Sequence, residues 1–136
     1  MPAIERHSFP DTTVPKAYGA YSHAVVAGDF VFLSGQIARN PTGEFAGGDV
    51  ASQTKRSIEI VVDILGRFDL TLADVVRCTV YLADIADFPP MNAAFAEAFG
   101  DMFPARSTPQ VQMPFGAKVG LEVTAFRGSR RSGTQP

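Results

Sequence analysis

The chain has 136 residues, of which 46% are hydrophobic and 19% are charged, and its formal net charge is −2 at pH 7. So small a charge provides no basic field for nucleic acid, and a single cysteine, Cys78, excludes an intrachain disulfide framework and any multi-cysteine metal site. No uninterrupted apolar run exceeds four residues and the first residues hold no hydrophobic signal core, so we expect a cytoplasmic protein without a membrane span.

The first part of the chain predicts a β-hairpin that follows an irregular lead-in. Residues 1–18 carry three prolines and show no clear period. The apolar and β-branched stretches 22–27 and 30–37 are separated by Gly28–Asp29, a two-residue signal for a hairpin turn. We therefore predict two antiparallel strands, followed by a turn-rich loop over 40–49.

A first helix is predicted over residues 50–68, with Asp49 as its N-cap. Apolar residues recur there at i, i+3, i+4 and i+7, which is typical of one face of an amphipathic helix. After the helix, a stretch rich in β-branched residues predicts a strand over 75–84. The apolar stripe of the helix consists of Ile58, Val61, Val62 and Leu65.

A second helix is predicted to begin after Asp87, which can cap it. Pro89 and Pro90 are tolerated because they fall in the first turn of this helix. Gly100 and Pro104 mark its end. Its apolar stripe consists of Met91, Ala94, Phe95, Ala98 and Phe99.

Two further extended stretches, near 106–113 and 119–127, give the order β-β-α-β-α-β-β. Two helices on one face of a mixed sheet form an α+β two-layer sandwich. We predict a single domain over residues 1–127 and a flexible polar tail over 128–136.

The second face of the predicted sheet is expected to be covered by another copy of the chain. The helices cover only one face, so the other face either meets water or is buried in an oligomer. Apolar groups on both sides of the last strand favour an oligomer. Leu121, Val123 and Ala125 alternate there with Glu122, Thr124 and Phe126, and Val80 and Leu82 alternate with Tyr81 in the strand before.

Arg106 and Glu122 are the strongest candidates for chemistry. Arg106 lies in FPARS (103–107), and Glu122 follows sixteen residues later inside an apolar strand. A guanidinium binds a carboxylate bidentately, and a glutamate in a partly apolar site can exchange protons with water or substrate. Together they suit a small carboxylate ligand whose other end needs a base. By spacing alone, two solvent-facing residues with no joint role are the more frequent alternative.

Other residues point to chemistry less strongly. His7 and His23 have no ligand partner at metal spacing beside them, so no metal site is expected. Ser34 lacks the Gly-x-Ser-x-Gly context of a hydrolase nucleophile, and no histidine follows it. The mid-strand position of Cys78 favours a buried structural thiol. The loop 43–48 matches neither a P-loop nor a dinucleotide fingerprint, so no cofactor is expected.

Six segments stand in a specific order and spacing: GAYSHAV (19–25), VFLSGQI (31–37), NPTGE (40–44), ADFPPMNAAF (86–95), FPARS (103–107) and LEVTA (121–125). With them, residues 15–127 resemble the reactive-intermediate (enamine/imine) deaminase family, the YjgF-like or Rid proteins, also labelled L-PSP endoribonuclease-like. Single segments such as SGQ or PARS would not be specific.

This resemblance implies a chorismate-mutase-like α+β fold and a homotrimer. In such a trimer three sheets wrap into a central β-barrel, and an active site lies in each cleft between subunits. The implied role of Arg106 is to hold the substrate carboxylate, and that of Glu122 is to orient or activate the attacking water.

The resemblance also assigns substrate-binding positions. Tyr21 would line the pocket, Ser34 and Gly35 would supply polar and backbone contacts, and Asn92 would begin the inward face of the second helix. Thr108 stands where many members have cysteine, and the backbone N–H used there toward the ligand does not depend on the side chain. The early Gly-Pro-Tyr of many members is Gly-Ala-Tyr here.

The implied reaction is the hydrolytic deamination of 2-imino acids and their 2-aminoacrylate tautomers to 2-keto acids and ammonia, without metal, flavin or pyridoxal. Two alternatives remain. One is a non-catalytic trimer that binds small ligands or regulates. The other is an endoribonuclease or translation inhibitor, which the net negative charge and the lack of a Lys/Arg stripe disfavour.

Overall fold

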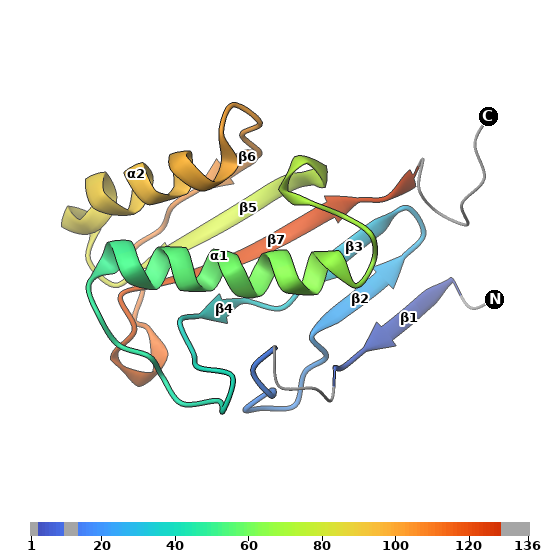
Figure 1. The fold of residues 1–136 in the computed structure, drawn as a ribbon, viewed down its shortest axis with the longest axis horizontal. Coiled ribbons are helices and arrows are strands. Elements are labelled where there is room, and N and C mark those ends of the chain that lie inside the picture. Colours follow the sequence, from blue (N-terminus) through green and yellow to red (C-terminus); the bar gives the residue numbers. More distant parts are fainter. Residues whose placement is uncertain (1–2, 10–13, 129–136) are drawn as a thin grey trace.

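The computed structural model describes residues 3–9 and 14–128. Within them, one mixed sheet has the strand order β1-β2-β3-β7-β5-β6, and β4 pairs separately with β7 (Figure 1). The strand pairs are antiparallel except β5 with β6, which is parallel. The strands are β1 (Ile4–His7), β2 (Ala24–Ala27), β3 (Phe30–Leu33), β4 (Gln36–Ile37), β5 (Val75–Leu82), β6 (Ala105–Ser107) and β7 (Val119–Phe126).

Two α-helices, α1 (Val50–Gly66) and α2 (Phe88–Phe99), lie together on one face of this sheet (Figure 1). Short 3-10 turns at Leu72–Asp74, Ile85–Asp87 and Pro114–Gly116 connect the elements. The predicted α+β arrangement, a mixed sheet with two helices on one face, is confirmed. Neither α-helix of the described residues is long and apolar enough to cross a bilayer. The predicted tail lies outside the described residues from position 129 onward.

The predicted hairpin is present, but its second strand is interrupted. Gly28 adopts φ 59°, a left-handed conformation that glycine reaches at little cost, and the ladder closes at Ala27 opposite Phe30. β3 ends at Leu33, and the chain then shifts so that β4 pairs with another part of β7. The expected strand 30–37 is therefore two strands, and residues 34–35 form the break between them.

Helix α1 begins and ends by identifiable hydrogen bonds. The Asp49 carboxylate accepts the Ser52 N–H at 2.8 Å, which confirms the predicted N-cap. At the other end Asp69 adopts φ 59°, and the Leu70 N–H donates to the Leu65 carbonyl at 3.0 Å, a Schellman closure. The prediction that Val62 belongs to the buried stripe of this helix is wrong, because this residue is 43% exposed.

Helix α2 buries Met91, Ala94, Phe95 and Phe99 as predicted, whereas Ala98 is exposed and that part of the stripe is wrong. Asp87 occupies the N-cap position, but its side chain makes no capping hydrogen bond. The prediction that the Asp87 side chain caps this helix is therefore wrong. The helix ends at Gly100, where φ is 67°.

After α2, only Ala105–Ser107 of the extended stretch expected near 106–113 forms a strand. Pro109 has no N–H to donate to a ladder, and the chain instead brackets Leu82: the Leu82 N–H donates to the Pro109 carbonyl at 3.0 Å and the Val111 N–H donates to the Leu82 carbonyl at 2.9 Å.

The two faces of β7 differ as its alternation predicts. Leu121, Val123 and Ala125 are buried between sheet and helices. On the opposite, open face, Phe126 is 41% exposed, and its ring lies 5.4 Å from that of Phe30. The expectation of apolar groups on both faces is confirmed, and the open face carries a row of exposed aromatic rings.

Candidate functional site

Arg106 is held against helix α2 at the edge of the sheet. β6 is an edge strand, and its register places Arg106 beside Cys78, so the two side chains point toward the helix-covered face. Arg106 Nη2 donates to Asn92 Oδ1 at 2.9 Å. The guanidinium carbon lies 4.7 Å from the ring centre of Phe95 and 5.3 Å from that of Phe88. One hydrogen bond and two aromatic faces thus orient the guanidinium.

A small hollow of about 150 Å³ opens beside this arginine, lined by residues that include Asn92, Phe103 and Pro104. Among the described residues no carboxylate forms an ion pair with Arg106. A guanidinium carries five N–H donors in a planar fork, and Asn92 accepts from one nitrogen. The arrangement can therefore receive a carboxylate from outside the chain.

Glu122 lies on the opposite, open face of the sheet. Its ladder partner is Thr79, the position after Cys78, and successive strand residues point to opposite faces. The Tyr81 hydroxyl donates to Glu122 Oε1 at 2.9 Å. This bond to the carboxylate, together with partial burial, raises the pKa of Tyr81 above its ordinary value. Glu122 is thus a carboxylate with one oxygen bound by a neutral donor.

The ring of Tyr81 lines a cavity of about 340 Å³ that also includes Tyr18 and Gly35. Gly120, opposite Tyr81 in the ladder, also lines this cavity. A Cβ on Gly120 would lie 3.1 Å from Met113 Cε and 3.3 Å from Ile37 Cγ2, closer than normal packing. The missing side chain at this position keeps the cavity open.

Ser34 is bonded to the chain itself, and Tyr21 packs against Tyr18, which lines this cavity. The Ser34 hydroxyl donates to the Ser22 carbonyl at 2.5 Å, so this side chain offers a ligand only an acceptor. The Tyr21 hydroxyl accepts the Tyr18 N–H at 3.2 Å, and the two rings pack edge to face with centres 5.6 Å apart. Tyr21 therefore contacts the cavity wall through Tyr18.

The candidate residues fall into two groups within one copy of the chain. Arg106 and Asn92 meet at the helix-side edge, and Thr108 follows β6 directly. Glu122 lies on the open face, Gly35 lines the cavity beside Tyr81, and Tyr21 contacts the Tyr18 wall of that cavity, whereas Ser34 is bonded to Ser22. A single copy does not bring Arg106 and Glu122 to one pocket.

Three contacts of these groups were not expected from the sequence. Tyr81 binds Glu122, and Phe88 and Phe95 cradle Arg106. The alternation of Tyr81 with Val80 and Leu82 places it on the outer face of its strand, but only the register with β7 shows that it reaches Glu122.

The remaining chemical candidates are structural. Burial raises the pKa of the Cys78 thiol to about 12, so it is not a thiolate nucleophile near neutral pH. His23 is buried, with Nδ1 accepting the Phe9 N–H at 3.0 Å and Nε2 bonded to the Pro15 carbonyl at 2.9 Å. Over residues 3–9 and 14–128, no cluster of three or more His, Cys, Asp or Glu side chains could hold a metal ion.

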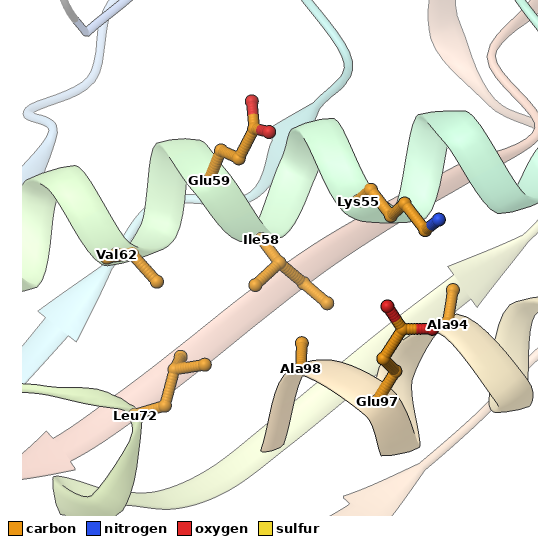
Figure 2. Close-up of a pocket in the computed structure, with 8 residues that line it drawn as sticks. All are labelled: Lys55, Ile58, Glu59, Val62, Leu72, Ala94, Glu97 and Ala98. Atoms are coloured by element: carbon orange, nitrogen blue, oxygen red, sulfur yellow. The ribbon is translucent and has the colours of Figure 1, made fainter. Parts of the chain in front are cut away.

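A further hollow, of about 460 Å³, lies between the two helices (Figure 2). Ile58 and Val62 of α1 face Ala94 and Ala98 of α2 across it. It explains why Val62 and Ala98 are exposed. None of the site residues predicted from the sequence lines it.

A mixed sheet covered on one face by two helices is the architecture that this chain shares with the E. coli YjgF gene product, whose crystal structure superposes with a TM-score of 0.81 at 34% identity. The chain belongs to the family described as endoribonuclease L-PSP, whose sequence profile matches residues 12–127. The resemblance seen in the sequence is thereby confirmed.

Individual relatives cover almost the whole chain. A RutC family protein of Pyrococcus abyssi is 43% identical over 115 residues, 83% of this chain and 91% of its own. The human 2-iminobutanoate/2-iminopropanoate deaminase is 34% identical over 130 residues, 94% of this chain and 95% of its own. The crystal structure of E. coli TdcF with bound serine superposes with a TM-score of 0.81 at 33% identity, covering 90% of this chain and 99% of that one.

Proposed function

We propose that this protein hydrolyses reactive 2-imino acids and their 2-aminoacrylate tautomers to 2-keto acids and ammonia. The observation that carries the proposal is Arg106, an oriented guanidinium with no carboxylate partner among the described residues, beside a hollow open to a small acid. The human relative is named for this reaction, and TdcF holds serine, a small molecule that carries a carboxylate.

The proposed active unit is a homotrimer whose open sheet faces form a central β-barrel. The exposed aromatic residues of that face, Phe30, Phe32 and Phe126, would be buried there, which removes apolar area from water. Arg106 lies at the edge of the sheet and Glu122 on its open face, so a neighbouring copy is needed to bring the two groups to one ligand. Each site would then lie in a cleft between subunits.

In this site the Arg106 guanidinium binds the substrate carboxylate and fixes the imine carbon within about 3–3.5 Å of a water molecule. Glu122 accepts a proton as the water oxygen attacks that carbon. The protonated imine thereby becomes a neutral carbinolamine. Glu122 then passes its proton to the nitrogen, the carbon–nitrogen bond breaks as the carbinolamine hydroxyl gives its proton to Glu122, and the departing ammonia takes up that proton, which leaves the 2-keto acid. Imines also hydrolyse unaided, so the protein needs to lower the activation free energy by only a few kcal/mol, at about 1.4 kcal/mol per tenfold in rate. Positioning of the substrate and one base are sufficient for that.

The other proposed positions shape the pocket around these two groups. Asn92 orients Arg106 through its amide oxygen, and Gly35 offers backbone contacts in the cavity beside Tyr81. Tyr21 packs against Tyr18 of that cavity, Ser34 directly precedes Gly35, and Thr108 directly follows the strand that carries Arg106.

The experiment generates 2-iminopropionate in situ with an amino-acid oxidase and follows its loss with wild-type protein, Arg106→Ala and Glu122→Gln. We expect the wild type to accelerate the loss and both variants to fall toward the uncatalysed rate. Equal rates with and without wild-type protein would remove this function. Light scattering should give about three times the chain mass of 14.6 kDa, and a particle of a single chain would leave the cleft without its second wall.

A non-catalytic binding trimer is the second candidate, and the serine bound to TdcF is the observation that favours it. The same samples separate the two functions. A binding protein would take up a 2-keto acid or serine, measured by calorimetry, with Arg106→Ala abolishing the uptake, while the imine disappears at its uncatalysed rate.

A further inference from the structure

We propose that Tyr81 is a positioning residue for this reaction, whose hydroxyl holds one oxygen of Glu122 so that the other oxygen faces the attacking water. The inference rests on the proposed function, because it takes Glu122 as the base.

The sheet register explains why Tyr81 can reach Glu122. Thr79 is the ladder partner of Glu122, and Gly120 is the ladder partner of Tyr81, so Tyr81 and Glu122 are diagonal neighbours on the open face. Gly120 presents no side chain between them. The phenol can therefore lean across β7 to Glu122 Oε1, which it meets at 2.9 Å.

No other described side chain holds this carboxylate. Arg77, the cation of β5 on the same face, donates through Nη2 to Ser107 Oγ at 2.7 Å. Thr79, although opposite Glu122, makes no side-chain hydrogen bond to it. Without Tyr81 the long glutamate side chain would be free to rotate among its staggered conformers.

A phenol suits this task better than a cation would. A neutral donor orients a carboxylate while stabilising its charge less than an ion pair does. The contact itself raises the pKa of Tyr81, so the phenol remains protonated through the neutral range and keeps donating. In the attack step the proton of water goes to the oxygen of Glu122 that Tyr81 does not hold, and Tyr81 keeps its own proton.

Tyr81 also lines the cavity beside the proposed substrate-binding position Gly35. The ring lines the cavity that contains Gly35, while its hydroxyl is bonded to Glu122. Movement of the ring would therefore move the base and the cavity wall together.

The test compares Tyr81→Phe with wild type in the imine assay. Phenylalanine keeps the ring and removes only the hydroxyl, so the cavity wall is preserved. We expect kcat to fall about tenfold, the effect of losing one hydrogen bond to a charged group, with KM little changed. A merely structural role would not lower kcat selectively while KM stays unchanged.

Two further variants test whether Tyr81 acts through Glu122. In the Glu122→Gln background, Tyr81→Phe should cause no additional loss, because its effect passes through the carboxylate. Thr79→Val is the matched control, since it removes a hydroxyl opposite Glu122 that makes no such bond, and its kcat should stay within about twofold of wild type.

A third measurement does not depend on turnover. The chain has three tyrosines and no tryptophan, so the Cζ resonances of labelled tyrosine can be assigned with single Tyr→Phe variants. In Glu122→Gln the Tyr81 resonance should titrate at lower pH than in wild type. An unchanged titration overturns the contact. An active wild type whose kcat is unaffected by Tyr81→Phe, or a loss that persists in Glu122→Gln, overturns the role. An inactive wild type overturns the proposed function, and the role of Tyr81 falls with it.

Discussion

Replacing Asn92 by alanine should weaken substrate binding because it frees the Arg106 guanidinium. The bond between Arg106 Nη2 and Asn92 Oδ1 is 2.9 Å long and partly buried. Hydrogen bonds to charged groups contribute roughly 1.5–3 kcal/mol. The rings of Phe95 and Phe88, 4.7 and 5.3 Å away, still hold the guanidinium, so we take the lower part of that range. A loss of about 1.5–2 kcal/mol corresponds to a KM about 13- to 30-fold higher.

The loss should appear in KM rather than kcat, because the carboxylate is bound alike in the ground state and the transition state. Steady-state rates with 2-iminopropionate give both constants, and calorimetry with the product 2-keto acid gives an independent Kd. Asn92→Asp is the sharper control: it keeps an acceptor for Arg106 but adds a negative charge that competes with the substrate, so it should bind less tightly than Asn92→Ala. Wild-type affinity in Asn92→Asp would refute the idea that this guanidinium binds the substrate carboxylate.

Three further outcomes follow from the described contacts. Leu121→Ala empties a fully buried position and should cost about 2–5 kcal/mol in chemical denaturation, whereas Val62→Ala, at a site 43% exposed, should cost under about 1 kcal/mol. Asp49→Ala should lower Tm, and Asp49→Asn should keep the cap at neutral pH. Because the Ser52 hydrogen bonds lower the pKa of Asp49, the advantage of wild type over Asp49→Ala should be complete above the ordinary Asp pKa and vanish as pH falls through the folded value. Cys78, whose pKa burial raises to about 12, should react with a thiol reagent only as fast as the protein unfolds, and immediate native labelling would contradict that.

Elements set by short-range chemistry were predictable from the sequence. The turn at Gly28 and the cap at Asp49 each depend on residues within a few positions, and both are present. The alternation around Leu121 also predicted two differing faces correctly. In each case the local pattern and the burial in the folded chain agree.

Periodicity failed where the neighbouring element decides burial. It gives the direction in which Val62 and Ala98 point around their helices, but the two helices leave a hollow between them at these side chains (Figure 2). The strand expected over 30–37 failed for a similar reason: Ser34 bonds back to Ser22, and the chain shifts to a new position along β7.

The relation between Arg106 and Glu122 could not be read from their spacing. An even separation of sixteen residues would place them on one face if the chain between them were a single strand. Irregular chain and the 3-10 turn Pro114–Gly116 lie between β6 and β7 and remove that parity. The register through β5 then places the two side chains on opposite faces.

That opposition leads to a complementation experiment. If each site takes Arg106 from one subunit and Glu122 from its neighbour, Arg106→Ala and Glu122→Gln chains are each inactive alone but can restore a site together. In trimers refolded from an equal mixture, an intact pair forms where a chain that retains Arg106 meets a chain that retains Glu122. With random assembly about a quarter of the interfaces should be intact, so imine hydrolysis should recover to about a quarter of the wild-type rate. Refolding each variant alone is the control. Activity no higher than in those controls, in trimers shown by mass spectrometry to be mixed, would mean that both groups must come from the same chain, and the intersubunit site would be wrong.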